Sequence, residues 1–329
     1  MAKIPMTFAC GLYDRMLALY TGEVQADGID LNFLAIDSPR QIFDRMGRNL
    51  DFDACEMSSS EVFSRHAAGR REMVALPVFP SRVFRHGFVT VNRKAVKSPK
   101  DLEGKRIGVP LYTQTAAVFI RGLLQDEYGV DLSGVHWVQG ATNSAQSHGN
   151  PAAPSPLKHV SIEQNSSGRS LSELLEANEI QAIIGSGLPD ALRTHPDVQR
   201  LFPNFHAVEL ESFKRTRIFP IMHLVAMRRD VYERHPFIAS SLYAAMNAAK
   251  DLALAKMRDT GALRYMLPGM TAELDVIDEV FGGDPWPYGV EPNRPTLEAL
   301  VQYMAEQHFI PRIIPIEELF VCLPGNFGR

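Results

Sequence analysis

The segment from Pro77 to His86, Pro-Val-Phe-Pro-Ser-Arg-Val-Phe-Arg-His, places Arg82, Arg85 and His86 within five residues between two apolar runs. Guanidinium groups beside a titratable imidazole suit a site that holds a small dianion and moves a proton. Residues 215–223, Arg-Thr-Arg-Ile-Phe-Pro-Ile-Met-His, repeat this composition and end at His223. We expect the two segments to form one cleft. The alternative is that the arginines solvate a loop and both histidines are hydrogen-bonded core residues.

Polar junctions follow several other apolar runs, at 11–15, 56–60 and 111–116. Ligands of two-lobed α/β proteins bind at the carboxyl ends of strands and the amino ends of the following helices. Thr115 can cap a helix whose free N–H groups point at an anion, although an ordinary helix cap explains it equally well. The candidate ligand-binding residues at these junctions are Arg15, Ser58, Tyr112, Gln114 and Thr115, and Glu56 is a candidate for orienting a histidine or contacting a phenol.

Strand and helix signals alternate along the chain, which predicts βαβ units on mainly parallel sheets. Strands are expected at 6–10, 29–36, 52–57, 73–79, 135–138, 157–162 and 180–184, and crossover strands at 88–92 and 218–227. Helices are expected at 13–20, 39–49, 59–68, 113–127, 170–177, 235–257, 271–281 and 296–308, and a flexible loop at 140–156. We therefore predict two α/β lobes, the first formed by 1–92 and 222–329 and the second, inserted lobe by 93–221.

The composition narrows the class of protein. With 329 residues and 45% apolar content the chain can bury the cores of two lobes. A net charge of -4 lacks the excess of positive charge that is typical of nucleic-acid-binding proteins. No stretch of the sequence is long and apolar enough to predict a membrane helix. The first residues do not resemble a secretory signal, so we expect a cytoplasmic protein. Cys10, Cys55 and Cys322 have no metal-ligand spacing, and we expect the first two to be buried.

Several segments resemble the 4,5-dihydroxyphthalate decarboxylase family, which has a type II periplasmic-binding-protein-like fold. The segments are 13–15, 77–86, 104–110, 125–129, 218–223, 286–288 and 293–294. The resemblance implies a two-lobed fold, cytoplasmic residence and removal of carbon dioxide from a dihydroxylated aromatic diacid, such as 4,5-dihydroxyphthalate in phthalate degradation, to give protocatechuate. Two segments, 141–156 and 185–190, depart from the family pattern.

Decarboxylation of an aromatic acid requires a proton at the ring carbon that loses the carboxylate, and a hydroxyl para to that carbon supplies the electron density. We assign Arg15 and Arg82 to the substrate carboxylates, with Arg85 in reserve, because guanidinium groups bind carboxylates bidentately. His86 and His223 are assigned to proton transfer, without a choice of acid and base. Trp286 and Tyr288 either cover the substrate ring or form a structural corner.

No cofactor is expected, and the partner is a small aromatic carboxylate. A divalent metal stays open, since Glu56, His86 and His223 would form a ligand set if they converged, although no paired-histidine motif supports it. The apolar carboxyl-terminal helices would permit a homodimer. The alternatives are a solute-binding or sensor protein for an aromatic acid, and a different lyase or decarboxylase on the same fold.

Overall fold

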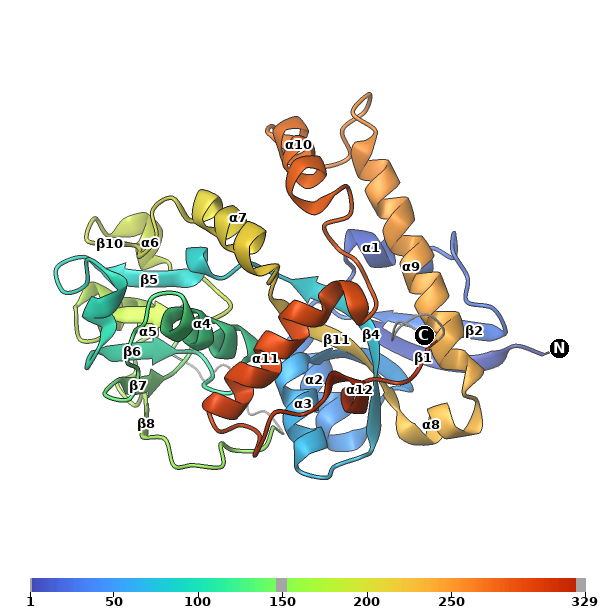
Figure 1. Ribbon diagram of the computed structural model, residues 1–329, viewed down its shortest axis with the longest axis horizontal. Coiled ribbons are helices and arrows are strands. Elements are labelled where there is room, and N and C mark those ends of the chain that lie inside the picture. Colours follow the sequence, from blue (N-terminus) through green and yellow to red (C-terminus); the bar gives the residue numbers. More distant parts are fainter. Residues whose placement is uncertain (1, 146–152, 324–329) are drawn as a thin grey trace. The chain divides into compact units, whose positions relative to one another are not determined.

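The computed structural model describes residues 2–145 and 153–323, which fold as two α/β units (Figure 1). Unit 1 comprises Met1–Arg82, His223–Leu297 and Ile314–Arg329, and unit 2 comprises Val83–Met222 and Glu298–Ile313. The sequence-based boundaries differ, because they place 83–92, 222 and 298–313 with the first lobe. Among the described residues, no helix is long and apolar enough to cross a membrane.

Unit 1 is built on a five-stranded sheet in the order β2-β1-β3-β11-β4. The strands are β1 (Ile4–Cys10), β2 (Ile29–Ala35), β3 (Ala54–Ser58), β4 (Met73–Arg82) and β11 (Ile221–Arg228). β1 pairs in parallel with β2 and β3, whereas β11 is antiparallel to β3. All five residues of β3 are buried, as expected for a strand covered on both faces.

The helices of unit 1 connect and cover these strands. They are α1 (Asp14–Tyr20), α2 (Pro39–Asn49), α3 (Ser59–Ala67), α8 (Arg229–Arg234), α9 (Phe237–Arg258), α10 (Met270–Phe281) and α12 (Ile316–Leu319), and α11 (Arg294–Glu306) begins in this unit. α2 begins as its sequence predicts, because the Ser38 side chain accepts a hydrogen bond from the N–H of Gln41 and Pro39 occupies the first turn. α9 packs along α1 (Figure 1).

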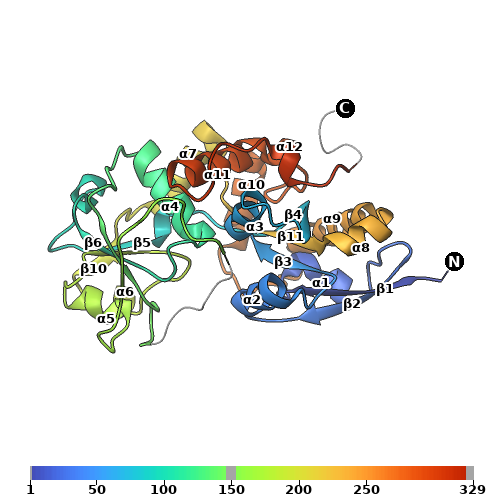
Figure 2. The same ribbon diagram turned by 90° about the horizontal axis from the view of Figure 1, so that it is seen from below.

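Unit 2 contains a six-stranded sheet in the order β10-β5-β9-β6-β7-β8. The strands are β5 (Val89–Asn92), β6 (Arg106–Val109), β7 (His136–Gln139), β8 (Ile162–Gln164), β9 (Ala182–Ile184) and β10 (Val198–Arg200). Its α-helices are α4 (Thr115–Asp126), α5 (Leu171–Glu176), α6 (Ala191–Thr194) and α7 (Phe205–Thr216). β9, β6, β7 and β8 are parallel, and β5 is antiparallel to β9 and β10. Figure 2 shows α4 and α5 on opposite faces of this sheet, as right-handed crossovers in opposite directions require.

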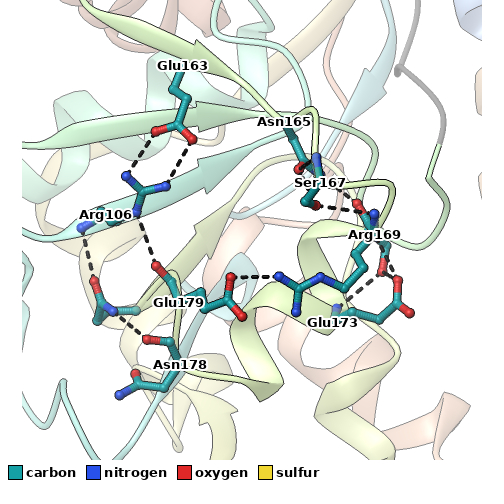
Figure 3. A network of polar contacts seen from close by, with 10 residues as sticks. Arg106, Glu163, Asn165, Ser167, Arg169, Glu173, Asn178 and Glu179 are labelled. Atoms are coloured by element: carbon teal, nitrogen blue, oxygen red, sulfur yellow. Dashed lines mark hydrogen bonds and ion pairs between the residues drawn. The ribbon is translucent and has the colours of Figure 1, made fainter.

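An exposed network of charged side chains joins β6 and β8 to the segments before and after α5 in unit 2 (Figure 3). Arg106 forms an ion pair with Glu163 at 2.9 Å, and its Nε donates to the carbonyl of Glu179 at 3.2 Å. The Glu179 carboxylate in turn pairs with Arg169 at 2.6 Å. Such solvated pairs contribute little to stability individually, and we assign this network a structural role only.

The α/β class with flanking helices is confirmed, and most elements lie where the sequence places them. Two expectations were wrong in detail, and several elements were not predicted. The expected strand at 157–162 is displaced, because β8 spans Ile162–Gln164. The segment 88–92 is a sheet strand inside unit 2 instead of a crossover strand. The elements that were not predicted are α6, α7, α8, α12 and β10. Of the loop expected at 140–156, residues 146–152 lie outside the described residues, and the rest forms neither helix nor strand.

Candidate functional site

Glu56 of β3 and His223 of β11 face each other because of the register of the two strands. In this antiparallel pair His223 lies opposite Ser58 and Val225 lies opposite Glu56. Residues two positions apart on a strand share a face, so Glu56 and His223 are diagonal neighbours on the same side of the sheet. The Nδ1 atom of His223 lies 2.5 Å from Oε1 of Glu56. Two residues that are 167 positions apart in sequence thus form a carboxylate–imidazole pair.

Glu56 is fully buried and accepts hydrogen bonds from several directions. The Tyr13 hydroxyl donates to Oε1 at 2.8 Å, the N–H of Gly11 donates to Oε2 at 3.2 Å, and the Cys10 thiol lies 3.5 Å from Oε2. Burial alone would raise the pKa of Glu56, but the charge and hydrogen bond of His223, together with the Gly11 and Tyr13 donors, leave the pKa lowered. Glu56 is therefore an ionised carboxylate inside the protein.

The carboxylate determines how His223 is oriented. An ionised carboxylate only accepts hydrogen bonds, so Nδ1 of His223 carries a proton and donates it to Glu56. The ring of Phe43 packs edge-on against the imidazole, with 4.8 Å between the ring centroids. The second nitrogen, Nε2, has no hydrogen-bond partner in the described part of the chain, and the side chain is 19% exposed. His223 is thus held on one side and presents Nε2 on the other.

The same junction carries two residues whose roles the sequence did not assign. The hydroxyl of Tyr13, the residue before α1, is held by Glu56, and burial next to that carboxylate raises its pKa well above the ordinary value. The Cys10 thiol at the end of β1 is also buried, and burial beside Glu56 raises its pKa. Both are therefore neutral hydrogen-bond donors to Glu56. Their position at the carboxyl end of β1 was the available signal, since Tyr13 belongs to the same 11–15 junction as Arg15.

Arg15 lies beside this pair, between two aromatic rings. Its guanidinium carbon is 4.3 Å from the ring centroid of Tyr13 and 4.4 Å from that of Trp286. Its Nε donates to the carbonyl of Pro80 at 2.6 Å, and Nη1 donates to Asp14 at 3.0 Å. Nη2 has no hydrogen-bond partner among the described residues. Arg15 is therefore rigidly positioned, with one N–H edge available.

A second basic group of unit 1 surrounds the end of β4. Arg82 is buried, which lowers its pKa to about 9 against the attraction of Asp284 and Tyr288. Lys250 is also buried and pairs with Asp284 at 2.5 Å and Asp251 at 2.9 Å. Tyr288 is buried and interacts electrostatically with Arg15 and Cys10. Trp286 donates its indole N–H to the carbonyl of Phe79 at 2.8 Å, so the 286–288 segment is tied to β4 and to Arg15.

Ser58 completes the predicted residues of unit 1. It is the last residue of β3, precedes α3, and is buried. Its hydroxyl lies 3.3 Å from that of Ser60. Because Ser58 lies opposite His223 in the register, its side chain shares the face that carries Glu56 and His223. The structure thus groups Arg15, Glu56, Ser58 and His223 in unit 1, with Arg82 at the end of β4.

The remaining predicted residues belong to unit 2. Arg85 is buried, and burial lowers its pKa to about 9 despite attraction to Glu209. Its Nη1 makes only a long contact of 3.5 Å to the carbonyl of Gly185, and its Nε has no hydrogen-bond partner among the described residues. A buried cation with so little compensation is a candidate ligand for an anion.

His86 has a different environment from His223. Its ring packs edge-on against Phe202 at 5.3 Å and Tyr128 at 6.0 Å between centroids. Neither ring nitrogen has a hydrogen-bond partner within residues 2–145 and 153–323. Burial lowers the pKa of His86 to about 4, although Glu127 opposes the shift. The ring is therefore neutral near pH 7 and packed like an apolar side chain.

Tyr112 and Gln114 lie between β6 and α4, and Thr115 begins α4. The Tyr112 ring packs against Trp137, and the Arg121 guanidinium lies 3.9 Å from its centroid, so Tyr112 belongs to the core of unit 2. Gln114 precedes α4 and donates to the Ser186 hydroxyl at 2.8 Å, while Thr115 is the buried first residue of that helix. Gln114 and Ser186 therefore connect the carboxyl ends of the adjacent parallel strands β6 and β9, where ligands of α/β sheets bind.

The candidate metal set does not assemble within one unit. Glu56 and His223 form a pair, but His86 belongs to unit 2. In the described part of the chain, no group of three or more His, Cys, Asp or Glu side chains is arranged to hold a metal ion. The expected burial of Cys10 and Cys55 is confirmed.

The chain is similar in sequence to two known proteins and in fold to solved structures. The chain is 38% identical over 310 residues to a 4,5-dihydroxyphthalate decarboxylase of Comamonas testosteroni, covering 94% of this chain and 92% of that one. It is 38% identical over 204 residues to the 4,5-dihydroxyphthalate decarboxylase of Pseudomonas putida, covering 61% and 78%. A family model described as NMT1/THI5 like matches residues 58–153.

Among solved structures, the periplasmic aliphatic sulphonate binding protein of Escherichia coli superposes with a TM-score of 0.55 at 11% identity, over 98% of this chain and 93% of that chain. At this identity the likeness concerns the fold alone. It confirms the periplasmic-binding-protein-like fold that the sequence predicts.

Proposed function

Because the chain belongs to the 4,5-dihydroxyphthalate decarboxylase family of carboxy-lyases, we propose that it decarboxylates a dihydroxylated aromatic diacid of the 4,5-dihydroxyphthalate type, giving protocatechuate and carbon dioxide. The assignment of roles depends on the buried, ionised Glu56 carboxylate. It binds Nδ1 of His223, and Nε2 of the same ring has no hydrogen-bond partner among the described residues.

In the proposed reaction the hydroxyl para to the departing carboxylate gives its proton to solvent, and its electron pair moves through the ring to the carbon that bears this carboxylate. That carbon takes a proton from Nε2 of His223. The bond to the carboxylate then breaks, its electron pair restores the aromatic ring and the phenolate, and carbon dioxide leaves. The phenolate and the His223 imidazole each take up a proton from solvent, so the net change is the replacement of the carboxylate by one proton. Glu56 stabilises the imidazolium that donates the proton and keeps the ring oriented, as carboxylates do in other acid–base pairs. The balance needs no oxidant and no reductant.

The substrate carboxylates need cationic partners, and we assign Arg15 and Arg82 of unit 1 to them. Arg15 is held by Pro80, Asp14 and two aromatic rings, and its Nη2 edge is available. Arg82 is a buried cation whose pKa is lowered to about 9, so an anion nearby would offset its desolvation. Arg85, Gln114 and Thr115 are further candidate substrate contacts in unit 2, and His86 stays a candidate only.

We also propose that no metal or organic cofactor takes part, because the para hydroxyl already provides the electron density that the proton transfer needs. Turnover is expected to be unchanged after dialysis against a chelator. A loss of activity that Mg²⁺, Mn²⁺ or Zn²⁺ restores would contradict this part of the proposal.

The direct test is the release of carbon dioxide from 4,5-dihydroxyphthalate, followed together with the change in its ultraviolet absorption. The substitution Glu56→Gln retains an oxygen acceptor for Tyr13 but removes the charge, and we expect kcat to fall by about two orders of magnitude, within the range of acid–base contributions. Tight binding of the diacid with no release of carbon dioxide would instead favour the alternative of a binding protein. Release from another aromatic acid alone would favour a different decarboxylase on this fold.

A further inference from the structure

A cavity of about 220 Å³ lies in unit 1 at the end of the sheet remote from the Glu56–His223 pair. It is lined by residues of α3, the turn after it, the start of β4, α8, the end of α12 and the two residues that follow α12. α3 begins directly after Ser58 and ends at this cavity, whereas β4 begins at the cavity and ends at Arg82. Since β4 has ten residues, the first and last residues of this strand are about 30 Å apart. The cavity is therefore separate from the proposed catalytic residues.

The wall of this cavity has an apolar part and a basic part. The apolar part includes Val62, Val74, Leu319 and Phe320, all of which are buried. The Phe320 ring is fixed by edge-on contacts with Phe63 and Phe79 at 5.9 and 6.1 Å, so this wall is rigid.

The basic part consists of Arg65, Arg70 and Arg229, with His66 beside them. Arg65 is buried, and its ion pair with Glu72 measures 3.9 Å. The ion pair of Arg229 with Glu233 measures 3.6 Å. The carboxylates of Glu72 and Glu233 lie outside the lining. Among the lining residues that the structure describes, Glu318 is the only acidic one. The lining thus carries three guanidinium groups against one carboxylate.

His66 lies beside these arginines in the lining. Its Nδ1 is in contact with the Arg71 guanidinium, which only donates hydrogen bonds, so Nδ1 is the acceptor. The planar guanidinium groups of arginine bind carboxylates and related oxyanions bidentately.

We propose that this cavity, which we call the arginine cavity, is a second ligand site that binds a small carboxylate bearing one apolar ring, of the size of benzoate. An apolar cavity of about 150 Å³ holds a benzene ring, so the volume here accommodates a ring and its carboxylate. The ring packs on Phe320 and Val74, and the carboxylate faces Arg70 and Arg229. The proposal is independent of the substrate of the Glu56–His223 pair.

The structure offers a reporter beside the arginine cavity. Cys322 is exposed, whereas the other two cysteines of the chain, Cys10 and Cys55, are buried, and Cys322 directly follows the lining residue Val321. An environment-sensitive fluorophore on Cys322 will therefore report on this cavity. We expect a saturable change in its emission when benzoate is added to the full chain, and the same affinity by calorimetry on the unlabelled protein. No saturable binding by either measurement would overturn the proposal.

A matched pair of variants on α8 locates the site. Arg229 lines the cavity and pairs with Glu233, while Arg234 on the same helix pairs with Asp230 with the same spacing and lies outside the lining. Arg229→Gln and Arg70→Gln should each weaken benzoate binding at least tenfold, as expected for the loss of a charged hydrogen bond, with decarboxylation in the absence of benzoate within twofold of wild type. Arg234→Gln should bind as wild type does. Equal affinities for Arg229→Gln and Arg234→Gln would contradict the assignment.

Inorganic phosphate tests the chemical class. It presents oxyanion oxygens to the arginines but has no ring for the apolar wall. We expect phosphate to bind at least tenfold more weakly than benzoate in the labelled protein. Equal affinities would show a general oxyanion site and would refute the requirement for a ring.

Discussion

His223 and His86 illustrate how differently two histidines can be used within one chain. In unit 1, the ring of His223 is held at Nδ1 by a buried carboxylate, which itself accepts hydrogen bonds from Tyr13 and Gly11. In unit 2, the ring of His86 packs against Phe202 and Tyr128, and its nitrogens have no hydrogen-bond partner in the described chain. A proton-transfer group must be oriented by a hydrogen-bond partner, and of these two environments the first provides one. Three experiments test this contrast, and a fourth tests the exposed charged network of unit 2.

The largest difference is expected in catalysis. His223→Gln removes the proposed proton donor, and kcat for carbon dioxide release should fall by about three orders of magnitude, while His86→Gln should lower it less than tenfold. The melting temperature of each variant provides the control for folding. If His86→Gln were the more damaging change in a folded protein, the assignment of the proton donor would be reversed.

The acid stability of the protein should depend on His86. Its pKa is lowered to about 4 in the folded state, whereas the unfolded ring takes up a proton below about 6.5. The unfolded state therefore binds more protons between these values, and stability is lost as the pH falls from about 6.5 towards 4. Replacing His86 by Leu should recover about 2 kcal/mol of the stability that wild type loses between pH 7 and pH 5.

Urea unfolding at the two pH values measures this difference. His195→Leu is the comparison variant, because this histidine is on the surface segment between α6 and β10. An equal pH dependence for wild type and His86→Leu would refute the buried, neutral state of His86.

A smaller effect is expected from the hydroxyl that holds Glu56. Tyr13→Phe removes the 2.8 Å hydrogen bond to Oε1 and keeps the ring that packs on Arg15. We expect kcat to fall about tenfold with little change in KM, since a hydrogen bond to a charged group contributes about 1.5–3 kcal/mol. Tyr20→Phe, at the exposed end of the helix α1 that follows Tyr13, should leave kcat unchanged. A change in KM alone would assign Tyr13 to substrate binding.

The smallest effect is expected in the exposed network of unit 2. Arg169→Ala breaks the ion pair with Glu179 drawn in Figure 3, yet both side chains are largely solvated. Its free energy of unfolding should change by less than about 1 kcal/mol, and activity should be unaffected. A large loss of stability would show that this network does more than connect the sheet edge.

Much of the architecture follows from local sequence signals, whereas the pairing at the site does not. Pro39 at the first turn of α2 and the uninterrupted apolar character of 73–79 indicate their elements directly. Glu56 and His223 are both recognisable as candidates, but their contact depends on the register of β3 with β11, which only tertiary packing determines. For the same reason, sequence patterns alone do not distinguish the role of His86 from that of His223. Tyr13 is identified as a site residue only by the hydrogen bond that its hydroxyl donates to Glu56.

The strand order of unit 1 affects how the chain folds while it is being synthesised. β11 lies between β3 and β4 in the sheet, although β3 and β4 are close in sequence and β11 is synthesised only after most of unit 2. Until then β3 and β4 lack their common neighbour, and the unpaired edges they expose are templates for aggregation. The slow, long-range insertion of this one strand would then govern the yield of native protein, so a chaperone that shields β-edges during translation should raise it.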